Sequence, residues 1–348
     1  MYHQIVGFRK TRFLFDCAYR TKMNKTASFF QHPIFQEEEC RISGGTVVFS
    51  RHGIPLLLLP RDKAVALRTI RLYLPQTRIG KMSVLLLRLL VHLRLLWLLP
   101  RVPIDSSASD AGSTSGYLVC NPAHGVRLIR VIKTEDGFVI EKIAERANAS
   151  PIESEYRLLQ RLSNRAYVPL VYDWKETDSL VAFRMASYGQ APACLNIGSI
   201  LHAWETCEEV CAEDCSFLQK LRPYFPDGFW QQLSKKRFRK AMVHGDFVPW
   251  NIRTTASNDL MCVDWEYAEE DGIAGFDFVY FILQQAVCVF RCPQEKLATV
   301  LKEVLQPNST LLRQYHVAEE GGGEFNAYGW TFEEAVQLVL AYRAFRKM

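Results

Sequence analysis

The chain has 348 residues, of which 49% are hydrophobic and 23% are charged. A chain of this length can bury a large core and exceeds one average domain. The formal net charge is only +5, from 42 Lys and Arg against 37 Asp and Glu. Nucleic-acid-binding proteins usually carry a stronger and more patterned excess, so we expect no nucleic acid among the partners.

Residues 1–39 are predicted to form a basic tail without regular structure. Their Lys and Arg residues are mixed among apolar ones, without the separate apolar core and small-residue cleavage site of a secretory signal. The sequence alone does not decide whether translation starts at Met1 or at Met23. Ten cysteines are scattered without a Cys-x-x-Cys pair, which favours thiols in a reducing cytoplasm over disulfides. We therefore expect a cytoplasmic protein.

Residues 40–112 are predicted to form an appended α/β unit with a linker. "GGTVVFSRHGIPLLLLP" indicates two strands around the turn at His52 and Gly53, and "RDKAVALRTIRLYL" has helical periodicity that stops at Pro75. The stretch 105–116 is rich in Ser, Gly and Asp, which is linker composition. We expect the appended unit to pack against the next lobe or to recruit a partner.

The Leu-rich run 83–99, "SVLLLRLLVHLRLLWLL", is the one candidate for a membrane segment. It is interrupted by Arg88, His92 and Arg94. A spanning helix needs about 20 apolar residues, and each central Arg costs roughly 2.5–3.5 kcal/mol on insertion scales. We therefore expect no transmembrane span. A buried or docking helix is the first interpretation, and peripheral contact of an amphipathic helix with a membrane is the second.

Residues 113–187 are predicted to form a small sheet with one helix. Apolar and polar residues alternate from 117 around turns at Asn121–Gly125 and 135–137, which indicates three antiparallel strands. "SPIESEYRLLQRL" then predicts a helix, with Ser150 as N-cap and Pro151 at the first helical position. Two further strands follow. The predicted order is strand, strand, strand, helix, strand, strand.

Residues 188–348 are predicted to be mostly helical. Helices are expected over 195–240, where Cys207, Cys211 and Cys215 would share one helix face, and in both "FDFVYFILQQAVCVF" and "TFEEAVQLVLAYRAFRKM". Two short strands, Asn251–Thr254 and Leu260–Trp265, are predicted around the polar turn "TASND". A basic run at 235–240 and an acidic run at 266–271 indicate solvated faces and select no substrate.

The stretch "MVHGDFVPWNI", 242–252, carries the chemistry. Asp246 and Asn251 are five residues apart in a loop that Pro249 stiffens, and Asp264 ends the second strand of the predicted hairpin. A hairpin reverses the chain, so Asp264 should return beside Asn251. Carboxylate and amide oxygens suit Mg²⁺. Asn251 and Asp264 are thus predicted metal ligands, and Asp246 is left to orient an attacking hydroxyl and accept its proton, as phosphoryl transfer requires.

A phosphate-binding half is predicted earlier in the chain. Lys142 lies on the third strand of the small sheet, and Glu155 follows thirteen residues later on the first long helix. A strand Lys held by a helix Glu is how a kinase directs an ammonium group at the nucleotide phosphates. Of the other residues around the catalytic loop, His244 and Asp277 are expected to brace it rather than to touch ligand.

These segments resemble the aminoglycoside phosphotransferase and choline kinase family of small-molecule kinases. "VHGDFVPWNI" resembles the family's His-Gly-Asp-x-x-Pro-x-Asn catalytic loop, "CVDWEYA" its metal-binding segment, and "GIAGFDFVYF" the Gly and Asp segment that follows. The match covers roughly residues 117–290. The resemblance implies an α+β, two-lobed, protein-kinase-like fold, with an N-lobe at 113–187 and a C-lobe at 188–348. It also implies ATP and Mg²⁺ as cofactors.

The resemblance also implies roles for single residues. Asp246 would be the catalytic residue, and Asn251 and Asp264 would hold Mg²⁺. Lys142 would contact the ATP phosphates, and Glu155 would hold Lys142 in place. The loop between Asn121 and Gly125 would cover the phosphates. The backbone around Met185 and Ser187 would contact the adenine. The phosphate loop departs from the family pattern because "CNPAHG" has a single Gly. The appended unit is also absent from the common pattern.

The predicted activity is transfer of the γ-phosphate of ATP to a hydroxyl of a small molecule. A sugar, an amino sugar, an amino alcohol and a cell-envelope precursor all remain open as acceptors. The alternative is a catalytically weak nucleotide-binding scaffold that engages a partner or membrane surface through residues 40–104. The complete set of Asp246, Asn251 and Asp264 favours the enzyme, because a scaffold has no need of all three.

Overall fold

The computed structural model describes residues 45–49, 55–75, 77–99, 101–102, 115–120, 126–192, 195, 197–255, 257–289, 291–304 and 330–346. These residues divide into two compact units. The first unit takes in the described residues within Met1–Tyr73, Met82–Ile152 and Tyr172–Ala186, and the second those within Leu74–Lys81, Glu153–Val171 and Ser187–Met348. The fold is mixed, with one large sheet and several helices.

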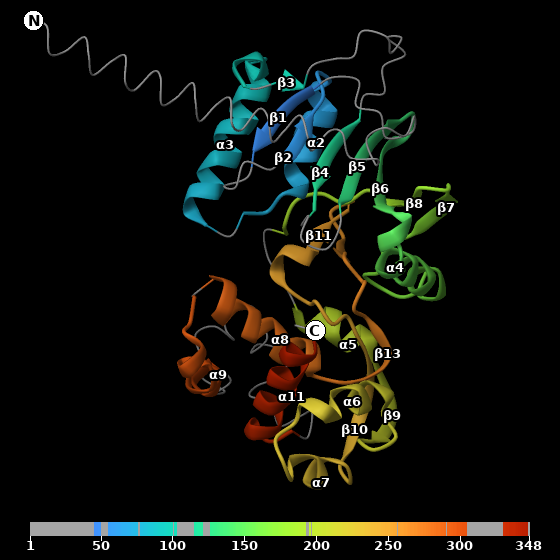
Figure 1. Cartoon of the computed structure of the whole chain (residues 1–348), viewed down its shortest axis with the longest axis vertical. Coiled ribbons are helices and arrows are strands. Elements are labelled where there is room, and N and C mark those ends of the chain that lie inside the picture. The colour runs from blue at the N-terminus through green and yellow to red at the C-terminus, as the bar shows by residue number, and fades with distance from the viewer. Residues whose placement is uncertain are drawn as a thin grey trace, which may run out of the picture. The chain divides into compact units, whose positions relative to one another are not determined.

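The first unit is built on an eight-stranded sheet with the order β3-β1-β2-β4-β5-β6-β8-β7 (Figure 1). Its strands are β1 (Gly45–Phe49), β2 (Pro55–Leu59), β3 (Arg101–Val102), β4 (Gly116–Val119), β5 (Arg127–Thr134), β6 (Gly137–Glu145), β7 (Val171–Glu176) and β8 (Leu180–Ala186). A short 3-10 turn (Arg146–Asn148) and α4 (Ser150–Arg161) separate β6 from β7. The predicted order over 117–187 is confirmed.

The sheet runs on from the predicted appended unit into the predicted N-lobe. β2 pairs antiparallel with β4, with Leu57 opposite Leu118 and Leu58 opposite Tyr117. Helices α2 (Lys63–Leu72) and α3 (Arg78–His92) follow β2, and a 3-10 turn (Leu96–Leu98) follows α3. The two strands and the helices predicted here are confirmed, whereas the boundaries of the four predicted domains stay predictions.

The helices of the first unit pack on the sheet through a stripe of aliphatic side chains. The cluster contains Leu57, Leu59, Ala66, Ile70, Val84, Leu87 and Val91. Asp62 caps α2, because its Oδ1 accepts hydrogen bonds from the N–H groups of Ala64 and Val65. Spacing of three and four residues thus places one face of each helix in the core.

The second unit combines two small sheets with six complete α-helices among its described residues, and it also contains most of α4. The strands are β9 (Glu205–Cys211), β10 (Arg237–Val243) and β13 (Glu269–Ile273), in the order β13-β10-β9, and the pair β11 (Ile252–Thr254) and β12 (Leu260–Cys262). The helices are α5 (Ile197–Trp204), α6 (Ser216–Leu221), α7 (Phe229–Leu233), α8 (Phe276–Gln284), α9 (Leu297–Val304) and α11 (Phe332–Phe345). A π-helical turn (Gln285–Val289) extends α8, and 3-10 turns span Arg222–Tyr224, Pro249–Asn251 and Gln294–Lys296. The predicted hairpin and C-terminal helices are confirmed.

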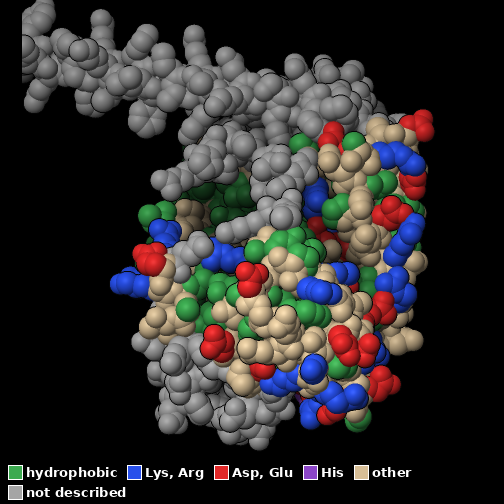
Figure 2. All heavy atoms as spheres, turned by 60° about the horizontal axis from the view of Figure 1, so that its bottom comes forward, with side chains coloured by type: hydrophobic (Ala, Val, Ile, Leu, Met, Phe, Trp, Pro, Cys, Tyr) green, Lys and Arg blue, Asp and Glu red, His purple; other side chains and the backbone are tan. Residues whose placement is uncertain are grey.

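The predicted helical character of 195–240 is wrong for two segments, which form β9 and β10. Cys207 and Cys211 lie on β9, so the three cysteines do not share a helix face. These two segments pair antiparallel with each other, with Phe238 opposite Val210, and the pairs Arg237–Glu209 and Arg239–Glu205 lie across the sheet. The face of the molecule in Figure 2 likewise mixes Lys and Arg with Asp and Glu side chains. Lys240 of the basic run also binds Asp271 of the acidic run, so the two charged runs partly neutralise each other.

Candidate active site

The predicted catalytic loop, residues 244–251, connects β10 to β11 and is fixed at its start by α8. Asp277 on α8 is buried, and it accepts hydrogen bonds from the N–H of His244 to Oδ2 (2.6 Å) and from the N–H of Gly245 to Oδ1 (3.1 Å). Gly245 has a φ of +74°, and a Cβ there would lie 2.3 Å from the carbonyl oxygen of Tyr267. The turn therefore requires glycine. The expectation that Asp277 braces this loop is confirmed.

His244 braces the loop from inside the core. Its Nδ1 accepts a hydrogen bond from the N–H of Asp246 (3.3 Å), so the ring proton lies on Nε2, which donates to the carbonyl oxygen of Val263 (3.1 Å). The ring is fully buried and contacts Trp204 and Trp265. A neutral imidazole thus ties the loop to the strand end that precedes Asp264.

Asp246 is held by three side chains. Its Oδ1 accepts hydrogen bonds from Arg346 Nη1 (2.9 Å) and from the Tyr280 hydroxyl (3.3 Å). Its Oδ2 accepts one from Asn251 Nδ2 (3.1 Å), which also donates to the Asp246 carbonyl oxygen (3.0 Å). Burial raises the pKa of Asp246 above its ordinary value, the cation of Arg346 opposes the rise, and the charge of Asp264 adds to it. Asp246 is thus oriented and made more basic than an exposed Asp.

The hairpin returns Asp264 beside Asn251, as predicted. Ile252 pairs with Cys262, and the N–H of Val263 donates to the carbonyl oxygen of Asn251 (2.8 Å). Asp264 has a φ of +75°, in the left-handed region that Asp and Asn adopt more often than other non-glycine residues. The role of both residues as metal ligands stays a prediction.

Glu155 is attached to the same segment. Its carboxylate is buried, and Oε1 accepts a hydrogen bond from the N–H of Trp265 (2.9 Å), the residue that follows Asp264. Sequence reasoning assigned Glu155 to Lys142 and did not foresee this bond. The contact shows that α4 positions the segment carrying Asp264, whereas the pairing with Lys142 stays a prediction.

The other predicted ATP contacts are distributed over both units. Lys142 is a buried residue of β6, opposite Ile129 and Phe183, and Met185 is a buried residue of β8. Both belong to the first unit, and Ser187, which follows β8, belongs to the second. Asn121 and Gly125 lie outside the described residues. All of these roles stay predictions.

Three residues near Asp246 were missed by sequence reasoning. Tyr280 lies on α8, and Tyr342 and Arg346 come from the last helix and the residue after it. The Tyr342 hydroxyl donates to the Gly245 carbonyl oxygen (2.8 Å), and Arg346 Nη1 donates to that oxygen (3.2 Å) and to the Tyr280 hydroxyl (2.9 Å). Helical spacing could have indicated Tyr280, because it lies three residues after Asp277 and therefore on the same face of the helix.

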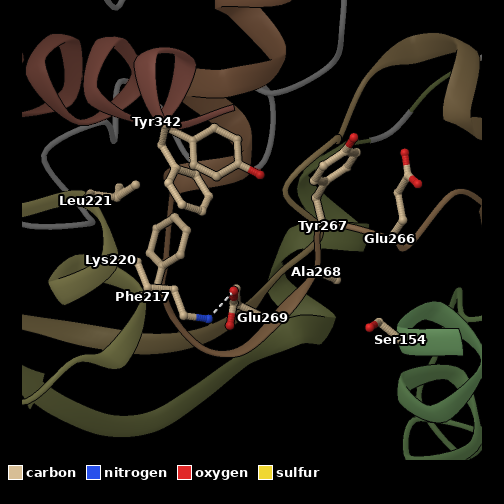
Figure 3. Close-up of a pocket in the computed structure, with 10 residues that line it drawn as sticks. Ser154, Phe217, Lys220, Leu221, Glu266, Tyr267, Ala268, Glu269 and Tyr342 are labelled. Carbon is tan, nitrogen blue, oxygen red and sulfur yellow. Dashed lines mark hydrogen bonds and ion pairs between the residues drawn. The ribbon is translucent and has the colours of Figure 1, made fainter. Parts of the chain in front are cut away.

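Tyr342 also lines a pocket of about 280 Å³ (Figure 3). It is lined by Ser154, Phe217, Lys220, Leu221, Glu266, Tyr267, Ala268, Glu269, Tyr342 and Phe345. The Lys220 ammonium and the Glu269 carboxylate form an ion pair on its wall. Tyr267 also contacts Arg346, whose guanidinium carbon lies 3.5 Å from the ring centroid. The pocket and Asp246 therefore share neighbours.

The donor atoms around Asn251 and Asp264 fit a hard cation. Because Asn251 directs Nδ2 at Asp246, its Oδ1 is the amide atom that can bind a metal, and Asp264 adds carboxylate oxygens. Within the described ranges, His, Cys, Asp and Glu residues form no group of three or more that could hold a metal ion. A site of one amide and one carboxylate would depend on substrate phosphates for further ligands.

Comparison with known proteins gives little similarity. No family model matches this chain, and no curated protein matches it. Among solved structures, the choline kinase LicA from Streptococcus pneumoniae is similar over 63% of this chain and 77% of that chain, with a TM-score of 0.34 and 13% sequence identity. Such values identify neither family nor activity, so we take the function from the residues of this chain.

Proposed function

We propose that the chain is an ATP- and Mg²⁺-dependent phosphotransferase that moves the γ-phosphate to a hydroxyl of a small molecule. The observation that carries the proposal is the hydrogen bond from Asn251 Nδ2 to Asp246 Oδ2 (3.1 Å), in a loop whose hairpin returns Asp264 beside Asn251. A proton acceptor, an amide oxygen and a second carboxylate thus come together. Positioning and charge neutralisation by such groups supply most of the catalysis in phosphoryl transfer.

Asp246 has one oxygen suited to the proton transfer. Oδ1 already accepts from Arg346 and Tyr280, whereas Oδ2 accepts from Asn251 alone. An acceptor hydroxyl would therefore donate to Oδ2. As its oxygen bonds to the γ-phosphorus, the bond from that phosphorus to the bridging oxygen breaks, ADP leaves, and the hydroxyl proton passes to Oδ2. The raised pKa of Asp246 favours this transfer.

Asn251 Oδ1 and the Asp264 carboxylate would hold the metal in this proposal. When bound, Mg²⁺ neutralises phosphate charge. The bond from Glu155 to the Trp265 N–H keeps the backbone after Asp264 in place. Lys142, Asn121, Gly125, Met185 and Ser187 remain the proposed contacts of ATP. The proposal includes the cytoplasm as location, because the reaction needs a compartment that supplies ATP.

A label-transfer experiment tests the activity and identifies the acceptor. The full chain would be incubated with γ-labelled ATP and Mg²⁺ in a soluble metabolite extract and, separately, in a membrane-lipid extract. We expect a labelled product in one extract that is absent with Asp246→Ala. The acceptor can then be assigned among sugars, amino sugars, amino alcohols and cell-envelope precursors. No labelled product in either extract would contradict the proposal.

A further inference from the structure

Helix α3 is apolar on two opposite faces. Val84, Leu87 and Val91 are buried against the core of the first unit. The other face carries Met82, Leu85, Leu86, Leu89 and Leu93, which are 52–65% exposed. Successive residues of a helix turn by about 100°, which places this second set opposite the buried one. Packing in the first unit therefore accounts for one face only.

The exposed set is concentrated rather than scattered. Among the described residues, twelve large hydrophobic side chains are exposed, and eight of them lie between 79 and 98. They are Ile79, Met82, Leu85, Leu86, Leu89, Leu93, Trp97 and Leu98, and we call this set the α3 face. Single exposed hydrophobic residues are normal on a protein surface, whereas a contiguous patch marks a binding surface.

The charged residues of the segment that carries the α3 face have one sign. The sequence from 63 to 104 contains no Asp or Glu and eight basic residues, which are Lys63, Arg68, Arg71, Arg78, Lys81, Arg88, Arg94 and Arg101. This segment alone carries more positive charge than the net +5 of the whole chain. Arg78, Lys81 and Arg94 are exposed next to the apolar side chains. The occupant of the face should therefore be both apolar and anionic.

We propose that the α3 face docks onto the surface of an anionic lipid membrane. Apolar side chains would enter the boundary between headgroups and acyl chains, and the basic residues would contact anionic headgroups, as in interfacial helices. Trp97, 60% exposed at the end of this segment, is the residue type that favours the membrane interface. Every helix among the described residues is too short or too polar to span a bilayer. The helix would lie on the membrane.

Charge also argues against a second copy of this chain as the occupant. Two α3 faces in contact would bring two segments without any acidic residue together, and like charges repel. An anionic membrane meets both requirements of the face at once. The proposal goes beyond the phosphotransferase activity and does not depend on it, since membrane binding can be measured without turnover.

Vesicle binding by the full chain tests the proposal. We expect binding to vesicles of phosphatidylcholine mixed with phosphatidylglycerol, little binding to phosphatidylcholine alone, and weakening by salt. The variant Leu86→Glu with Leu89→Glu should lower binding by about tenfold or more, since it places two charges at the apolar contact. Leu170→Glu with Tyr172→Glu is the matched control, because both residues are about as exposed but do not belong to the α3 face, and it should bind like the wild type.

Trp97 provides a second measurement that does not rely on charged variants. Its emission, taken as the difference between wild type and Trp97→Phe, should shift to shorter wavelength when anionic vesicles are added. Equal binding of the two double variants, or no binding and no shift with anionic vesicles, would overturn the proposal. A dimer that forms without vesicles and is lost in Leu86→Glu with Leu89→Glu would also overturn it, in favour of a second copy.

Discussion

Arg346 fixes the orientation of the Asp246 carboxylate. Its Nη1 binds Oδ1 of Asp246, the Gly245 carbonyl oxygen and the Tyr280 hydroxyl, so the carboxylate cannot rotate freely. We expect Arg346→Met to lower kcat by about a hundredfold, since small misplacements of a catalytic group have effects of this size. The KM for ATP should change little, and Arg346→Lys should restore part of the rate.

Steady-state kinetics of these variants check the positioning role. Arg343→Met is the control, because it removes a cation from α11, three residues before Arg346. A rise in the KM for ATP with unchanged kcat in Arg346→Met would contradict the role.

Asp277 makes stability depend on pH near neutrality. Burial raises its pKa to about 7, although the N–H groups of His244 and Gly245 oppose the rise. An Asp in the unfolded chain has a pKa of about 3.9, so between about pH 4 and 7 the folded chain binds the extra proton. Its contribution to the free energy of unfolding is therefore fully present below about pH 4, falls by up to about 1.4 kcal/mol per pH unit as pH rises, and is lost above about 7.

Denaturant unfolding between about pH 5 and 8 measures this slope. Asp277→Asn should be less stable than wild type, because its amide nitrogen cannot accept from a backbone N–H, and its pH slope should be flatter. Identical slopes in the two proteins would show that Asp277 does not titrate in this range.

The candidate site shows how far sequence reasoning reaches at the residue scale. Asp246, Asn251 and Asp264 were predicted together because one loop and one hairpin contain them. Tyr280 and Arg346 reach Asp246 across 34 and 100 residues of chain, and no local pattern encodes such contacts. Glu155 was recognised from its place on a helix, but its bond to the Trp265 N–H, 110 residues away, was not.

Strands β5, β6 and β8 share a buried ionic ladder. Glu141 lies opposite Arg130 on one side and Arg184 on the other, and its side chain is 1% exposed and binds both. We expect Glu141→Gln to lower the free energy of unfolding by about 3–5 kcal/mol, because Arg130 would lose its counter-charge while buried. Glu209→Gln, which breaks an exposed cross-strand pair with Arg237, should cost no more than about 1 kcal/mol.

Chemical denaturation of both variants tests the ladder. If both variants lost the same free energy of unfolding, burial of Glu141 would add nothing to the strength of its ion pairs.

Elements were predictable where one face is buried. β5 alternates buried and less buried residues, and the pattern of α2 follows the helical period, so both are readable locally. β9 and β10 cannot be recognised from local sequence, because these segments form strands by pairing with each other across 28–34 residues. A local reading of β9 as helical has no access to that pairing.

At the scale of the whole molecule, strands β1, β2 and β3, which precede residue 113, are part of the first unit's sheet. Val47 and Leu58 belong to one core cluster with Tyr117, Val119 and Leu128. A chain shortened to residues 113–348 would lose these contacts and leave the β4 edge unpaired, so we expect it to unfold or aggregate. Size-exclusion chromatography and thermal unfolding check this, and a monomer with an unchanged unfolding midpoint would contradict it.

The most direct test of the proposed activity separates turnover from ATP binding in Asp246→Ala. Transfer from γ-labelled ATP and the Kd for ATP would be measured with Mg²⁺ for wild type, for this variant, and for Asp259→Ala, which changes an exposed carboxylate on the turn between β11 and β12. We expect kcat to fall at least about a hundredfold in Asp246→Ala, with the Kd for ATP nearly unchanged, and Asp259→Ala to behave like wild type. Comparable turnover in wild type and Asp246→Ala would contradict the account.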